Sequence, residues 1–119
     1  MVNSIKINVR EIQAQPKVKL VEVAGELDSP SAKKLEDALA PLTNEAGVNI
    51  ILDCENLNYI NTVGMITLMK YCVKAKRSKG GFKLIKINRN IKEVLDLSGA
   101  LKLLEIYASL DEAVKSIAG

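Results

Sequence analysis

Along the chain, segments with apolar residues at the spacing of a strand alternate with segments at the spacing of a helix. This alternation constrains the fold more than any other feature. Over residues 5–9 every second residue is apolar, which is typical of a strand with one buried face. A second strand is expected over 18–23, with Pro16 closing the turn before it and Gly25 ending it. Because the two strands are joined so closely, we expect them to pair antiparallel.

Helical and strand-like segments then follow one another. The capping residues and proline of 28–31 predict the start of a helix of about three turns. The apolar run 48–54 predicts a strand covered on both faces. Later segments repeat the alternation: helices are expected from Thr62 to Lys79, from Asn88 or Asn90 to Gly99, and from the capping box of Ser109 and Glu112, with strands at 82–87 and 103–107.

This order, ββαβαβαβα, predicts an α/β fold in a single domain that spans residues 1–119. Strands that alternate with helices imply parallel pairing through right-handed crossovers, and the opening pair adds an antiparallel component. We therefore expect a mixed sheet of four to five strands with about four helices. At 48% apolar residues, the chain can bury enough surface for one ordinary core.

Composition argues against catalytic and metal sites. The chain has no histidine, and its two cysteines, Cys54 and Cys72, form no C-x-x-C pair, so both are expected to be small buried residues. Asp28, Asp53 and Glu55 could be paired carboxylates or a magnesium site, but helix capping and hydrogen bonds to loop backbone explain them better. Since no glycine-rich phosphate loop is present either, we expect no cofactor, no metal and no enzyme.

Charge and hydropathy point to a cytoplasmic protein that contacts neither nucleic acid nor membrane directly. The net charge of +3 is spread along the chain, and no signal-peptide core or membrane-length apolar run occurs. Lys70, Lys74 and Arg77 have helical spacing and could form a basic stripe toward phosphates or an acidic partner. A solvated helix face is the simpler explanation, and few aromatic residues are available to stack on bases.

The segment 57–65 has the most unusual composition in the chain. It leaves a buried strand and enters a helix, with Asn61 or Thr62 at the cap and apolar residues around them. A phosphate added here would lie at a helix N-terminus, where free amides and the helix dipole stabilise negative charge. A plain helix cap with an apolar flank explains the same residues.

In its order of motifs, the sequence resembles the STAS domains of bacterial anti-sigma factor antagonists over nearly its whole length. The stretch 21–28 resembles the family's strand that ends in Gly-Glu-Leu-Asp, and 50–53, with Leu57 and Ile60, its central strand and loop. Residues 61–65 fall where these proteins carry Asp-Ser-Ser/Thr-Gly-Leu. The segments 80–84, 94–99 and 109–113 follow in the family's order.

The resemblance implies a binding module in a partner switch. An unphosphorylated antagonist captures an anti-sigma factor that is also a serine kinase, and phosphorylation of the second hydroxyl residue of the loop reverses this. A monomer or weak homodimer is expected. The partner-binding surface is expected in the loop 58–65 and the following helix, with these residues: Asp28, Ser29, Asn58, Ile60, Asn61, Thr62, Val63, Gly64 and Met65.

The chain departs from the family pattern at the switch itself. Val63 occupies the phosphoacceptor position and has no oxygen to phosphorylate, while Asn61 replaces an aspartate. Thr62 matches the first hydroxyl and is the phosphorylation candidate. Either Thr62 is the acceptor, or the domain binds without being switched. We favour the second, because neighbouring residues at a helix start point in different directions.

Other classes of function remain open. The domain could be a scaffold component that is never phosphorylated. It could also be a sensor of a small ligand or nucleotide that uses the helix N-termini near Thr62 and Asn90 as anion sites. An enzyme is the least supported class, since no nucleophile and base can be paired from the sequence.

Overall fold

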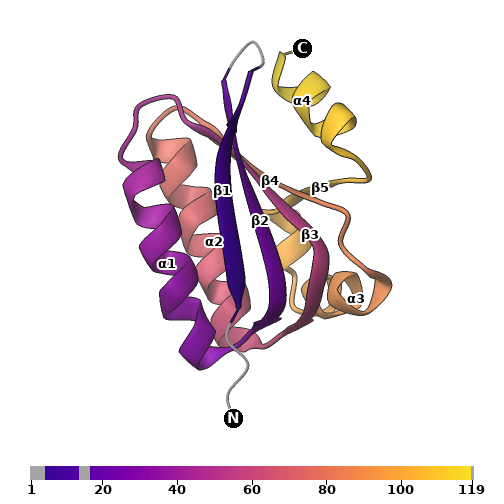
Figure 1. Ribbon diagram of the computed structural model, residues 1–119. Helices are drawn as coiled ribbons and strands as arrows, with labels where there is room; N and C mark the ends of the chain where they lie inside the picture. Colours follow the sequence, from indigo (N-terminus) through magenta and orange to yellow (C-terminus); the bar gives the residue numbers. More distant parts are fainter. Residues whose placement is uncertain (1–4, 14–16, 119) are drawn as a thin grey trace.

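A five-stranded sheet is the central element of the computed structural model, which describes residues 5–13 and 17–118. The turn expected at Pro16 lies outside the described residues. The elements follow one another in this order (Figure 1): β1 (Lys6–Ile12), β2 (Val18–Leu27), α1 (Ser29–Thr43), β3 (Asn49–Ile60), α2 (Thr62–Arg77), β4 (Gly81–Ile85), α3 (Arg89–Leu97), the 3₁₀ helix η1 (Ala100–Lys102), β5 (Glu105–Tyr107) and α4 (Leu110–Ala118).

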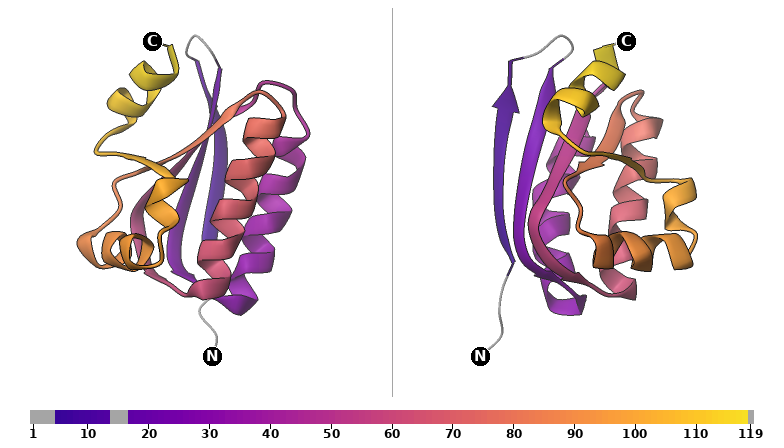
Figure 2. Two further views of the ribbon diagram at one scale, coloured as in Figure 1. Left: turned by 180° about the vertical axis from the view of Figure 1, so that it is seen from behind. Right: turned by 90° about the vertical axis from the view of Figure 1, so that its right-hand side faces the viewer.

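The sheet is mixed, as the sequence predicts. Its strand order is β1-β2-β3-β4-β5, in which β1 and β2 pair antiparallel and every later pair is parallel. Figures 1 and 2 show α1 and α2 side by side over one face, with α4 on the opposite face. The predicted α/β domain with a mixed sheet of four to five strands and about four helices is confirmed.

Two apolar clusters hold these layers together. The larger cluster joins the sheet to α1, α2 and α3 and contains residues such as Leu35, Leu52 and Leu68. The smaller cluster lies under α4, where Ala113 packs with strand residues. Cys54 and Cys72 are buried and unpaired, which confirms the expectation that they are small core residues.

Two strands extend further than the sequence predicts. Gly25 does not end β2; it adopts a positive φ of 113° beside a register shift, and the strand continues to Leu27. The third strand runs on to Ile60 instead of stopping at Cys54, so residues 58–60 of the expected loop 58–65 are strand and residues 62–65 already belong to α2. Its polar second half pairs only with β2, and Asp53 accepts a hydrogen bond from the Glu55 N–H (3.0 Å) at the irregularity.

Helix starts agree closely with the capping signals. Asp28 caps α1, which has 15 residues and so about four turns instead of three. Of the two alternatives at α3, Asn88 is the cap, and its side chain accepts from the Ile91 N–H at 2.9 Å. At α4 the Glu112 N–H donates to Ser109 Oγ (3.2 Å), as in half of a capping box.

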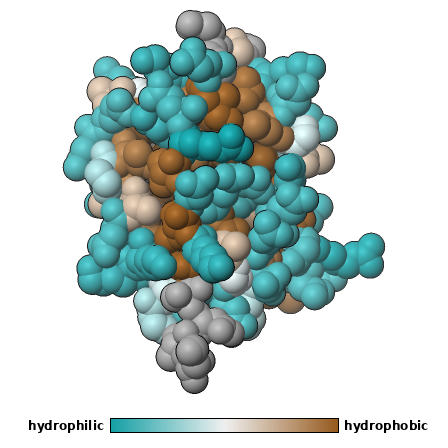
Figure 3. Space-filling view, in the orientation of Figure 1, coloured by the Kyte–Doolittle hydropathy of each residue, from teal (hydrophilic) through white to brown (hydrophobic). Residues whose placement is uncertain are grey.

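The face that carries α4 is polar beyond the area that this helix covers. Figure 3 shows apolar surface toward α4 giving way to hydrophilic side chains across the middle of the sheet. Here the Asn8 side-chain amide donates to Glu22 Oε1 (2.9 Å), and Arg10 lies 3.5 Å from the same oxygen. These polar side chains are therefore partnered with one another.

Candidate functional site

The starts of α1 and α2 lie together at the carboxyl ends of β2 and β3. Leu27 pairs with Ile60 in the sheet, and the Asn61 N–H donates to the Leu27 carbonyl at 3.1 Å. Gly64 makes this approach possible, because a Cβ there would lie 2.6 Å from the Leu27 carbonyl oxygen. The structure therefore brings Asp28 and its neighbours to the segment 58–65, as expected for one surface.

At the start of α1 the polar groups of Asp28 and Ser31 form hydrogen bonds with one another. Asp28 Oδ1 accepts from the Ser31 N–H (3.2 Å), and the Asp28 N–H donates to Ser31 Oγ (2.8 Å). The buried Ser31 hydroxyl also donates to the Glu26 carbonyl at 2.7 Å. This closed capping box confirms that Asp28 caps a helix, and it holds the Asp28 side chain in place.

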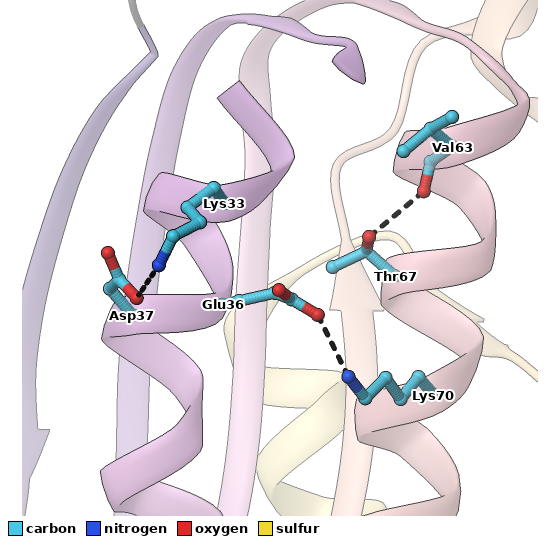
Figure 4. A network of polar contacts seen from close by, with 6 residues as sticks. All are labelled: Lys33, Glu36, Asp37, Val63, Thr67 and Lys70. Carbon is cyan, nitrogen blue, oxygen red and sulfur yellow. Dashed lines mark hydrogen bonds and ion pairs between the residues drawn. The ribbon is translucent and has the colours of Figure 1, made fainter. Parts of the chain in front are cut away.

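At the start of α2 only the side chain of the cap Asn61 forms a hydrogen bond of this kind. Asn61 Oδ1 accepts from the Gly64 N–H at 2.9 Å, while Thr62 and Val63 in the first turn are exposed. The Thr67 hydroxyl one turn on donates to the Val63 carbonyl at 2.9 Å (Figure 4). The first turn of α2 thus presents a threonine hydroxyl and a valine side chain to solvent.

The predicted partner-binding residues differ in accessibility. Ser29, Asn58, Thr62 and Val63 are exposed, and Asp28 and Asn61 are half-buried caps. The remaining three, Ile60, Gly64 and Met65, are buried. Buried residues shape the surface from beneath and do not form its outer layer.

Sequence reasoning missed exposed apolar residues beside this segment. Val63 is among the expected partner-binding residues and is 43% exposed, but Ile66 and Tyr59, which are 56% and 49% exposed, were not named. Met65 and Leu68 form the buried side instead. Apolar residues on more than one side of a helix start were the available signal, since a helix with a single buried face needs only one apolar stripe.

The end of α3 adds a further apolar residue. Ser98 Oγ lies 2.8 Å from Met65 Sδ and donates to the Leu95 carbonyl at 2.9 Å, so this end of α3 contacts the start of α2. Leu97, directly before Ser98, is 90% exposed. An apolar side chain is thus exposed on α3 one residue away from its contact with α2.

Charges flank the apolar residues in pairs. Lys70 on α2 donates to Glu36 on α1 at 3.0 Å, and this hydrogen bond and charge raise the pKa of Lys70 (Figure 4). Lys33 and Asp37 form a second pair within α1 at 3.1 Å. Of the three residues that could form a basic stripe on α2, Lys70 already has an acidic partner on α1.

The other residues considered as reactive groups or metal ligands have roles in the fold instead. Burial raises the pKa of both Cys54 and Cys72, which disfavours a reactive thiolate. Glu55 forms an ion pair with Lys86 (3.7 Å). Within residues 5–13 and 17–118, no group of three or more His, Cys, Asp or Glu is placed to hold a metal. Over the same ranges, no helix has the length and apolar character needed to cross a bilayer.

Comparison with known proteins gives a consistent family. The sequence model of the STAS domain matches residues 9–113. An anti-sigma-B factor antagonist from Bacillus subtilis is 25% identical over 111 residues, covering 93% of this chain and 94% of that protein. In structure, an anti-sigma factor antagonist from Mycobacterium paratuberculosis has a TM-score of 0.83 at 24% identity, covering 98% and 96% of the two chains. The Bacillus cell fate determinant SpoIIAA in its phosphorylated form has a TM-score of 0.70 at 16% identity, covering 94% and 99%.

The chain belongs to the STAS domain family, which confirms the resemblance seen in the sequence. The Bacillus subtilis relative that it matches is an anti-sigma-B factor antagonist.

Proposed function

We propose that this STAS domain is an anti-sigma factor antagonist that docks an anti-sigma factor and thereby regulates transcription by partner switching. The observation that carries the proposal is the exposed apolar surface where α2 begins. We name it the α2-start surface. Its exposed members are Ser29, Asn58, Tyr59, Thr62, Val63, Ile66 and Leu97.

The composition of this surface suits a protein partner. Three aliphatic side chains, Val63, Ile66 and Leu97, are exposed on two helices that contact each other through Met65 and Ser98. When a partner covers solvent-exposed apolar groups, the free energy of binding becomes more favourable by roughly 25 cal/mol for each Å² of apolar surface that is buried. The buried Gly64 and Met65 hold the surface in one shape, so little ordering is needed on docking.

The proposed docking is not controlled by phosphate at the family's acceptor position, because Val63 has no oxygen to phosphorylate. Val63 lies in line with Ile66 on the outward side of α2, and its side chain extends the apolar surface. Thr62 precedes it by one residue and is rotated by about 100° around the helix axis. A kinase that phosphorylates the outward position would therefore have to approach Thr62 from a different direction.

Direct binding tests the proposal. Each anti-sigma factor encoded in the source genome is purified and titrated with the wild-type protein by calorimetry. Wild type should bind one of them, and Ile66→Asp should weaken that binding at least ~30-fold, since a charge would be buried in the interface. Val63→Asp should act in the same direction.

A matched control separates docking from folding. Val9 on β1 is 40% exposed, close to the 43% of Val63, so Val9→Asp introduces the same charge at a similar exposure elsewhere. Val9→Asp should leave binding within about twofold of wild type, with circular dichroism verifying that each variant is folded. Failure of every anti-sigma factor to bind wild type would contradict the proposal, as would equal effects of Val9→Asp and Val63→Asp.

A further inference from the structure

The outward side of α2 changes character along its length. Val63, Ile66, Lys70, Lys74 and Arg77 follow one another at intervals of three or four residues, so they form one stripe along the helix. All five are exposed. The first two are apolar and the last two are cationic, with Lys70 between them. The stripe therefore has an apolar half and a basic half.

The basic half carries two cations without an ion-pair partner among the described residues, although Lys74 Nζ also lies 5.3 Å from the centre of the Tyr71 ring. Lys70 is neutralised by Glu36 at 3.0 Å, but no described residue forms an ion pair with Lys74 or Arg77. Compensation of the helix dipole explains a cation in the last turn, yet Lys76 supplies one there from a different side of the helix. The alignment of Lys74 and Arg77 with the apolar residues is left unexplained by helix stability.

We propose that this stripe is a two-part docking surface for an acidic partner protein, which covers Val63 and Ile66 with apolar side chains and sets carboxylates against Lys74 and Arg77. The proposal rests on the proposed function and deepens it by stating the chemistry of the anti-sigma factor's docking face. Val63 and Lys74 are eleven residues apart, as are Ile66 and Arg77. The partner's carboxylates therefore lie about 16 Å from its apolar contacts, at 1.5 Å per residue.

The two halves of the stripe act on different rate constants. Exposed charges steer the encounter of two proteins, so Lys74 and Arg77 raise the association rate constant, and added salt weakens their effect. Apolar side chains buried at an interface mostly slow dissociation. Non-specific binding by an apolar patch would not make one set of residues change the association rate constant and the other set change the dissociation rate constant.

Surface plasmon resonance tests this with the purified anti-sigma factor that binds wild type in the calorimetric experiment. The double variant Lys74→Glu/Arg77→Glu should lower the association rate constant about tenfold at 50 mM salt, and this gap should narrow at 500 mM. Ile66→Ala should instead raise the dissociation rate constant, with the association rate constant changed less than about twofold.

The matched control is Lys6→Glu/Lys115→Glu, which makes the same change in net charge at two exposed lysines on β1 and α4. It should leave the association rate constant within about twofold of wild type. Because reversed charges in the last turn of α2 could unfold it, the milder pair Lys74→Gln/Arg77→Gln is measured as well and should show an intermediate effect.

The outcomes distinguish this inference from the function on which it rests. If wild type binds and Ile66→Asp abolishes binding, but the Lys74 and Arg77 variants behave like the control, the two-part surface is wrong and the proposed function stands. If no anti-sigma factor binds wild type, both are overturned.

Discussion

The starts of α1 and α2, which meet at the carboxyl edge of the sheet, are both capped by a side chain but differ in how many of their polar groups are hydrogen-bonded. At α1 the cap Asp28 and the buried Ser31 bond to each other and to the strand before them. At α2 the side chain of the cap Asn61 accepts only from the Gly64 N–H, and Thr62 and Val63 directly after it are exposed. One start is closed by its own polar groups, while the other is open to a partner.

The difference shows how one local motif can hold a fold or present a surface. Both starts need a cap, because the first amides of a helix lack partners within the helix. Only α1 uses the third helical residue to close a reciprocal box, and α2 carries Gly64 at the same place. Glycine there allows α2 to approach Leu27, which fixes the position of the exposed Thr62 and Val63.

The largest effect is expected from removing that close approach. Gly64→Ala places a Cβ 2.6 Å from the Leu27 carbonyl oxygen and 2.7 Å from its Cγ, so backbone has to move. We expect the free energy of unfolding to fall by about 3 kcal/mol, at the upper end for overpacking. Urea denaturation measures this.

Gly81→Ala is the matched control for that substitution. Its Cβ would meet only the Asn49 side chain, at 3.2 Å, and this side chain can turn aside. A loss of stability at Gly64 no greater than at Gly81 would contradict the role given to the approach of α2 to Leu27.

A second comparison separates the closed start from the open one. Ser31→Ala removes a buried hydroxyl that bonds both the Asp28 N–H and the Glu26 carbonyl, and it should cost about 1–2 kcal/mol of unfolding free energy. Thr62→Ala removes an exposed hydroxyl and should change stability by less than about 0.5 kcal/mol. Thermal unfolding of both variants measures the difference, and equal losses would mean that the Thr62 hydroxyl is structural.

The smallest effect concerns the charge missing from the α2 cap. Asn61→Asp keeps the acceptor for the Gly64 N–H and adds a negative charge at a helix N-terminus, which should stabilise the fold by about 0.3–1 kcal/mol. The helix end lowers the pKa of this carboxyl in the folded state. The gain should therefore be present above its unfolded pKa of about 3.9 and disappear as pH falls through the folded pKa. A gain that persists at pH 2 would contradict this origin.

Much of the fold follows from the sequence because its signals are local. The capping residues Asp28 and Asn88 mark helix starts, and the apolar run 48–54 marks the central strand. The extension of β3 to Ile60 could not be predicted, since its polar residues are held by pairing with β2, a contact distant in sequence.

The candidate site could be predicted only in outline. The segment 58–65 was found from its composition and its resemblance to a family. Ile66 and Leu97 were missed because apolar residues at helical spacing usually face the core, whereas these two are exposed. The pairing of Lys70 with Glu36 was also missed, because it joins two helices that are distant in sequence.

The central claim is that the open start of α2 docks its partner without a phosphate switch. Peptide mass spectrometry of the protein from its native cells, with and without stress, tests this most directly. We expect no phosphate on Thr62 under any condition, while phosphate is readily detected on other proteins in the same extract. Phosphate on Thr62, together with release of the anti-sigma factor from the phosphorylated protein, would contradict it.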